Sequence, residues 1–211
     1  MRTVIEPSAE KQRSVVDMDR LPDQFPTHRH SSAFWEQLGR TVATFGFLEE
    51  VLGKAIFALT ATIKYKESEI EDAFAKWLPT LERALTDTLG RLTEAYGKAV
   101  RSHPEAAYKD LDELLSRLRD AAQLRNVLCH GSWSSPDAEG KSMPRYVSNK
   151  MMVFDTPVDI AYLKQTQRAV AELACHVINS VTSMGYQFPG FQKGPGAVVW
   201  KRGSGNQLAS W

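Results

Sequence analysis

The chain has 211 residues, of which 43% are hydrophobic and 24% charged, with 26 basic side chains against 25 acidic ones. This composition is typical of one medium-sized globular domain, and the net charge of +1 excludes a protein that coats duplex DNA through a general basic excess. Two cysteines, Cys129 and Cys175, are too few for a disulfide framework, and no apolar run is long enough to span a bilayer. We therefore expect a cytoplasmic protein without a membrane segment, in which any nucleic-acid chemistry comes from a small local site.

The two ends of the chain lack the apolar periodicity of its middle. Residues 1–30 contain three prolines among many charges, which predicts a flexible N-terminal arm. Residues 188–211 contain two prolines and five glycines, which predicts a Gly/Pro-rich C-terminal tail, although the apolar run 198–200 is able to dock on another surface. The folded domain is expected to span residues 31–187.

Apolar side chains recur in this domain every three or four residues, which predicts amphipathic helices. The helical patterns run from Ser31 to Ile63, from Phe74 to Tyr96, from Glu105 to Gly131 and from Pro157 to Gly185. Ser31–Ser32 is the expected N-cap of the first helix, and the second pattern is expected to break or restart at Pro79. Gly131 is the expected C-terminal cap of the third pattern.

The interval 132–156 interrupts this pattern. Residues Arg145–Asn149 and Met151–Phe154 favour strands and meet at Asn149–Lys150, which predicts a small β-hairpin. The fold class is therefore all-α: an up-down bundle of four to five long helices, with a β-hairpin insertion between the last two.

Two charged residues occupy positions where a core residue is expected. Arg125 interrupts an otherwise apolar helical seam, and Glu49 does the same on the first helix. An unpaired buried charge is costly, so the simplest interpretation is a structural Glu49–Arg125 ion pair between two helices. A positioned guanidinium also serves phosphate chemistry, so the pair does not exclude a functional role.

The same helix has a second, polar face, which ends beside Arg125. Its members are Asp112, Ser116, Arg119, Gln123, Asn126 and His130. Such a face is most often simply solvated. Its end is different, because an imidazole, a guanidinium and an amide within about one turn suit phosphoryl-transfer chemistry.

The run Arg125-Asn126-Val127-Leu128-Cys129-His130 resembles the R-x4-H motif of the HEPN superfamily, the nucleotide-binding domains of higher eukaryotes and prokaryotes. The motif of that family lies at the end of a late helix in a helical bundle, often with a polar residue after the arginine. Asn126 fits this preference, and the resemblance covers roughly residues 32–185.

The resemblance implies a homodimer with two facing motifs and, in catalytic members, a metal-independent RNase. His130 is then the proton-transfer group, Arg125 stabilises phosphate charge and Asn126 assists positioning. Attack of a ribose 2′-hydroxyl on the adjacent phosphate leaves a 2′,3′-cyclic phosphate. Many such proteins are toxins or phage-defence effectors, with an antitoxin or defence-system partner, whereas others are non-catalytic modules that bind a nucleotide or a protein.

Other residues extend this hypothesis to substrate binding. Arg119 and Gln123 on the polar face, Trp133 after the motif and Arg145 on the predicted hairpin are candidate RNA contacts. Packing is the alternative role of Trp133, and ordinary surface charge that of Arg145. The Cys129–His130 and Cys175–His176 pairs point in directions about 100° apart on a helix, so we expect no metal and no cofactor.

Overall fold

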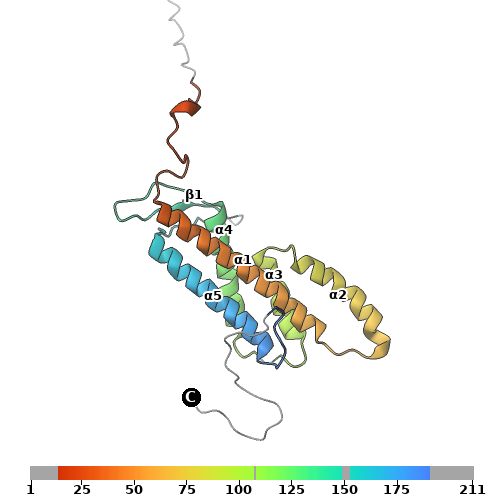
Figure 1. Ribbon diagram of the computed structural model, residues 1–211. Coiled ribbons are helices and arrows are strands. Elements are labelled where there is room, and N and C mark those ends of the chain that lie inside the picture. The colour runs from red at the N-terminus through yellow and green to blue at the C-terminus, as the bar shows by residue number, and fades with distance from the viewer. Residues whose placement is uncertain (1–13, 107, 149–152, 191–211) are drawn as a thin grey trace, which may run out of the picture.

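The computed structural model describes residues 14–106, 108–148 and 153–190 as a helical bundle with a short sheet at one end (Figure 1). The long helices are α1 (Ser32–Ala61), α2 (Ile70–Ala84), α3 (Leu89–Ser102), α4 (Leu111–His130) and α5 (Ile160–Thr182). The short elements are β1 (Ser132–Trp133), β2 (Pro144–Arg145) and the 3-10 turns η1 (Met18–Arg20) and η2 (Glu67–Glu69). The all-α fold with a hairpin insertion between the last two helices is thus confirmed.

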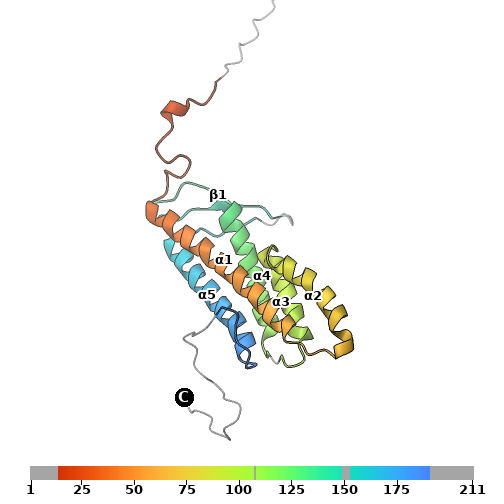
Figure 2. The ribbon, with the colours of Figure 1, turned by 45° about the vertical axis from the view of Figure 1, so that its right-hand side comes forward.

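Successive helices alternate in direction, as expected of an up-down bundle. The starts of α1 and α5 lie at one end, beside the sheet and the end of α4, while α2 lies at the edge of the molecule in both views (Figures 1 and 2). Contacts along α3 and α4 run in opposite orders, because Glu94 pairs with Arg119 whereas Arg101, later on α3, pairs with the earlier Asp112. The core lies between α1, α3, α4 and α5.

The first helix begins as its sequence predicts and forms the centre of the core. The Ser31 hydroxyl accepts a hydrogen bond from the Phe34 amide, which satisfies one of the free N–H groups at the helix start. Leu48, Leu52 and Ile56 are almost fully buried. None of the helices in the described ranges is long and apolar enough to cross a membrane.

Close packing joins α3 to α4 and α5. A Cβ built on Gly97 would lie 2.8 Å from a Leu115 methyl, so the absence of a side chain allows the two helices to approach. Tyr96 is fully buried, and its hydroxyl donates a 2.8 Å hydrogen bond to the Ser180 hydroxyl on α5. Burial raises the pKa of Tyr96 to about 12, so the phenol stays neutral.

The second predicted helical pattern breaks at a different residue from the one expected. Pro79 lies inside α2, and the chain turns instead over residues 85–88 before α3 starts. Pro79 and Ala75, four residues before it, are both exposed, so water is able to bond the carbonyl that the proline leaves without a partner. The starts of α4 and α5, at Leu111 and Ile160, are also later than the sequence patterns suggested.

The insertion pairs different residues from those that the sequence singled out. The regular ladder joins Ser132 to Arg145 and Trp133 to Pro144, in antiparallel register. The predicted pairing of 145–149 with 151–154 is represented by a single bridge between Val147 and Val153, and the expected Asn149–Lys150 turn lies outside the described residues. Ser132 and Trp133 lie inside the predicted insertion, but a strand of two residues is too short to show an alternating pattern, so the prediction did not single out β1.

The last residues of the N-terminal arm pack on the body. Trp35 donates its indole N–H to the Thr27 carbonyl at 2.9 Å, and Arg29 donates to the Ser135 hydroxyl. His28 and His30, which belong to this arm, are partly buried. The folded part of the chain begins before residue 31.

Gly131 allows the turn from α4 into β1 through close approach rather than through an unusual backbone conformation. Its φ is −69°, but a Cβ would lie 2.5 Å from the Val127 carbonyl oxygen and 3.0 Å from the Pro144 Cβ. We expect Gly131→Ala to lower the free energy of unfolding by about 1–3 kcal/mol, because backbone must move to admit the methyl. Denaturant unfolding measures this loss.

Gly39→Ala is the matched control. Gly39 lies in α1, where a Cβ would meet nothing within 4 Å. The added methyl should stabilise the helix by about 0.5–1 kcal/mol. If the two alanine variants unfolded alike, close approach at Gly131 would not be the constraint on this turn.

Candidate functional site

The last turn of α4 extends beyond the start of α3, the helix that packs along the earlier turns of α4. The pairs Glu94–Arg119 and Arg101–Asp112 place α3 antiparallel to α4, and α3 begins at Leu89, which brings its start level with about residue 123. Cys129 lies 11 residues after the buried Leu118 and therefore shares its helix face, yet Cys129 is exposed. The R-x4-H motif thus occupies a helix end that α3 leaves uncovered.

Arg125 points from this end toward α1. Its Nε lies 3.8 Å from Glu49 Oε1, and the two side chains are 31% and 27% exposed. Its guanidinium also donates a 3.4 Å hydrogen bond to Asn126 Oδ1. The predicted Glu49–Arg125 pair is therefore present, but at a separation and exposure that leave the guanidinium accessible.

Arg125 lines a cleft of about 710 Å³ between α1, the end of α2 and the turn at residues 85–88. Lys54 and Phe57 of α1, Asp87 of the turn and Pro189 also line it. Lys54 pairs with Glu50, and Arg125 pairs with Glu49 at the side of the cleft that α4 forms. The cleft combines apolar walls with charged groups of both signs.

His130 is exposed at the last position of α4. In the described part of the chain its ring has no hydrogen-bond partner. His130 lies five positions after Arg125, which is a rotation of about 140° around the helix, and Asn126 lies between the two directions at about 100°. Arg125 and His130 therefore point in directions about 140° apart, and His130 is absent from the described residues that line the cleft of Arg125. The end of α4 nevertheless carries a guanidinium, an amide and an imidazole within six consecutive residues, a set of groups that suits phosphate chemistry.

The hairpin brings Arg145 to this helix end, whereas Arg119 is placed elsewhere. Arg145 is exposed and pairs in the ladder with Ser132, two residues after His130. Arg119 lies 11 residues, or about 16 Å, before His130 and bonds Glu94 at 2.8 Å. The Glu94 carboxyl has a lowered pKa because of this hydrogen bond. Gln123 is exposed on the same helix face as His130, about two turns before it.

Trp133 lies in an aromatic cluster rather than on the open end of the helix. Its ring centroid is 5.1 Å from that of Phe34 and 6.4 Å from that of Trp35, both in edge-on geometry, and His30 packs edge-on beside it. These contacts account for Trp133 as a packing residue. Its contact with a base stays a prediction.

Apart from Glu49, sequence patterns missed the cleft residues outside α4. Lys54, Phe57 and Asp87 lie on α1 and on the turn before α3, and only the packing of α2 and α3 brings them to Arg125. Local spacing carries no signal for such a meeting of distant segments. The sequence signal for Phe57 is its position, because it is a large apolar residue one place beyond Ile56 and therefore lies outside the apolar seam of α1.

No group of three or more His, Cys, Asp or Glu side chains in the described ranges could hold a metal ion. Comparison with protein-family models, with curated proteins and with solved structures gives no match. The geometry of the α4 end therefore carries the functional argument.

The Glu49–Arg125 pair, with its 3.8 Å separation and partly exposed side chains, should contribute little to stability. We expect Glu49→Gln to lower the free energy of unfolding by less than about 1 kcal/mol, because solvent screens a pair of this kind. Leu52→Ala, at a fully buried position on the same helix, should cost about 2–5 kcal/mol. Comparable losses in the two variants would show that the pair is a structural element rather than a weakly held arginine.

The aromatic cluster should loosen as His30 gains a proton. Burial lowers the pKa of His30 below its ordinary value of 6.5, and its Nε2 is buried without a hydrogen-bond partner among the described residues. The unfolded chain therefore binds the proton more readily, and stability should fall as pH drops below about 6.5. His30→Phe should remove part of this dependence, measured as Tm between pH 7.5 and 5.5, whereas identical pH profiles would contradict the assignment.

Proposed function

We propose that this protein is a metal-independent endoribonuclease of HEPN type that acts through Arg125, Asn126 and His130. The carrying observation is the end of α4, which carries an exposed His130 and, five residues earlier, a partly exposed Arg125 that bonds Asn126. The bundle, with this motif at the end of its fourth helix, supports the proposal. No metal is needed for this chemistry, because the proton and the charge are handled by side chains.

In the proposed reaction the ribose 2′-hydroxyl attacks the adjacent phosphorus, and the bond from phosphorus to the 5′-oxygen breaks. The 2′-hydroxyl loses its proton, the departing 5′-oxygen gains one, and a 2′,3′-cyclic phosphate remains. His130 carries out proton transfer. Arg125 stabilises the charge on the phosphate oxygens, and Asn126, which bonds Arg125, positions that group.

The proposal includes RNA as substrate, a homodimer, and a cytoplasmic toxin or phage-defence role with an antitoxin or defence partner. A chain with a net charge of +1 has little general attraction for nucleic acid. The footprint on RNA is therefore short, with Arg145 at the motif end supplying a further phosphate contact. A groove between two copies would add affinity.

A non-catalytic module that binds a nucleotide or a protein is the second candidate. The Glu49–Arg125 ion pair favours this second candidate, because Glu49 pairs with the guanidinium that a nuclease would need for phosphate. In such a module Arg125 is a structural or ligand-holding group, and His130 has no role. Replacing His130 would then leave binding of the partner unchanged.

Cleavage of RNA in the presence of EDTA tests the proposal. We expect wild-type protein to cleave single-stranded RNA, and His130→Ala to lower the rate by about 100-fold or more through loss of proton transfer. Arg125→Lys should also lose most activity, because an ammonium cannot replace the planar guanidinium.

Cys129→Ser is the matched control, since Cys129 is an exposed neighbour of His130 on the same turn with no role in the reaction. It should retain wild-type activity. Undiminished cleavage by folded His130→Ala would refute the assignment, and absence of cleavage by the wild type on all RNAs would favour the binding module.

A further inference from the structure

The second helix leaves most of its apolar side uncovered. Among its residues only Ala84 is fully buried, although α2 carries large apolar side chains along its length. Ile70, Phe74 and Leu78 are 53%, 56% and 40% exposed, and Leu85, just after the helix, is 79% exposed. These positions fall within an arc of about 80° on the helix. Side chains scattered singly would need no explanation, but a continuous stripe indicates a docking surface.

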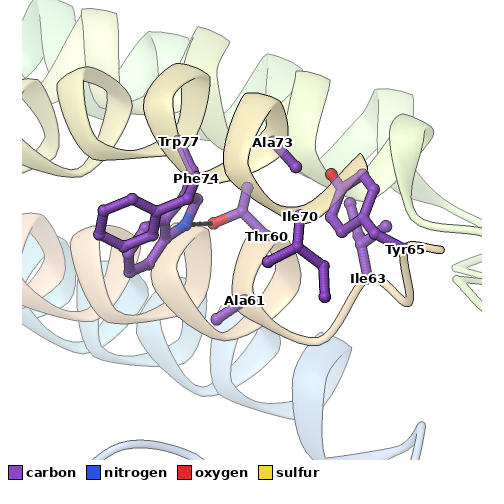
Figure 3. Close-up of a pocket in the computed structure, with 8 residues that line it drawn as sticks. All are labelled: Thr60, Ala61, Ile63, Tyr65, Ile70, Ala73, Phe74 and Trp77. Atoms are coloured by element: carbon purple, nitrogen blue, oxygen red, sulfur yellow. Dashed lines mark hydrogen bonds between the residues drawn. The ribbon is translucent and has the colours of Figure 1, made fainter. Parts of the chain in front are cut away.

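The stripe joins further apolar groups from α1 and from the connection to α2. We call the α2 face the surface formed by Phe57, Tyr65, Ile70, Phe74, Leu78 and Leu85. Figure 3 shows Phe74 and Trp77 reaching from α2 toward the last turns of α1, where the Trp77 indole donates a 2.8 Å hydrogen bond to Thr60. The ring centroids of Phe57 and Trp77 are 5.7 Å apart, and those of Trp77 and Phe74 are 5.8 Å apart.

The described chain ends beside this face. Pro189 lines the cleft that Phe57 and Leu85 also line, and a Cβ on Gly190 would lie 3.1 Å from the Lys54 ammonium. Residues 191–211 lie outside the described residues and start from this point. Val199 follows Gly190 by nine residues, and nine residues span up to about 30 Å when extended. Phe57 is only one helical turn along α1 from Lys54, so Val199 is able to reach beyond Phe57.

The two segments also have opposite charge. Residues 65–87 contain six acidic and three basic side chains, a net charge of −3, whereas residues 191–211 contain Lys193, Lys201 and Arg202 and no acidic residue, a net charge of +3. Glu71 and Glu82 lie at one edge of the α2 face, about 20–40° beyond Leu78 on the helix. The run Ala197-Val198-Val199-Trp200 is therefore followed at once by two cations that match this acidic edge.

We propose that residues 197–202 of the same chain cover the α2 face, with Val199 and Trp200 on its aromatic centre and Lys201 and Arg202 along its acidic edge. Three independent observations support this occupant: the uncovered apolar stripe, the position of Gly190 and the opposite charges. A short connection gives the segment a local concentration in the millimolar range, which favours it over a second copy at ordinary protein concentration. The contact is independent of any nuclease activity.

A disulfide cross-link in the full chain tests this contact. Cys129 and Cys175 are exposed and are replaced by Ser, and the pair Phe74→Cys with Val199→Cys is then introduced. The control pair is Arg168→Cys with Val199→Cys, because Arg168 is exposed on α5, which lies on the other side of α1 from α2 (Figures 1 and 2). Under mild oxidation the first pair should close within one chain about tenfold faster than the control.

Charge reversal provides a second arm. Lys201→Glu with Arg202→Glu, in the Phe74–Val199 cysteine background, should slow closure to the rate of the control pair, because the acidic edge then repels the segment. Equal rates for the two original cysteine pairs, no effect of charge reversal, or a disulfide that joins two chains would each overturn the proposal. The last result would assign the α2 face to a second copy.

Discussion

The antiparallel packing of α3 on α4 is the constraint on which the candidate site depends. Gly97 lets the helices approach closely at Leu115, and the pairs Arg101–Asp112 and Glu94–Arg119 show their antiparallel register. Because the chain must still turn after α2, α3 starts level with about residue 123 of α4. The end of α4 consequently has no α3 beside it, and Cys129 and His130 are exposed there, although Val127 and Leu128 of the same turn are buried.

The same turn also shapes the rest of the surface. It places residues 85–88 against α1, so that Arg125 lines a cleft instead of a sealed core. It also leaves α2 with α1 as its main neighbour, and therefore with much of its apolar side exposed. A chain with almost equal numbers of acidic and basic residues thus has separate charged regions, one acidic around α2 and one basic in residues 191–211.

Sequence periodicity was sufficient to predict the bundle and the Ser31 cap, because each depends on residues three or four apart. It also predicted the Glu49–Arg125 pair, because each of these charges interrupts an apolar seam. It failed at Pro79, where exposure makes the lost hydrogen bond tolerable. It also missed the cleft, which is built from segments far apart in the sequence. The pairing of Arg119 with Glu94 depends on the packing of α3 against α4, which no local pattern on α4 reveals.

The chemistry assigned to Arg125, Asn126 and His130 leaves a specific mark on its product. Attack by the 2′-hydroxyl forms a ring on the phosphate and releases a free 5′-hydroxyl, whereas attack by water directed at the other ester bond leaves a 3′-hydroxyl. Mass spectrometry of the fragments from a defined RNA, digested in EDTA, is therefore the most direct test. The account predicts 2′,3′-cyclic phosphate ends paired with 5′-hydroxyl ends at each cleavage site, and new 3′-hydroxyl ends paired with 5′-phosphate ends at those sites would contradict it.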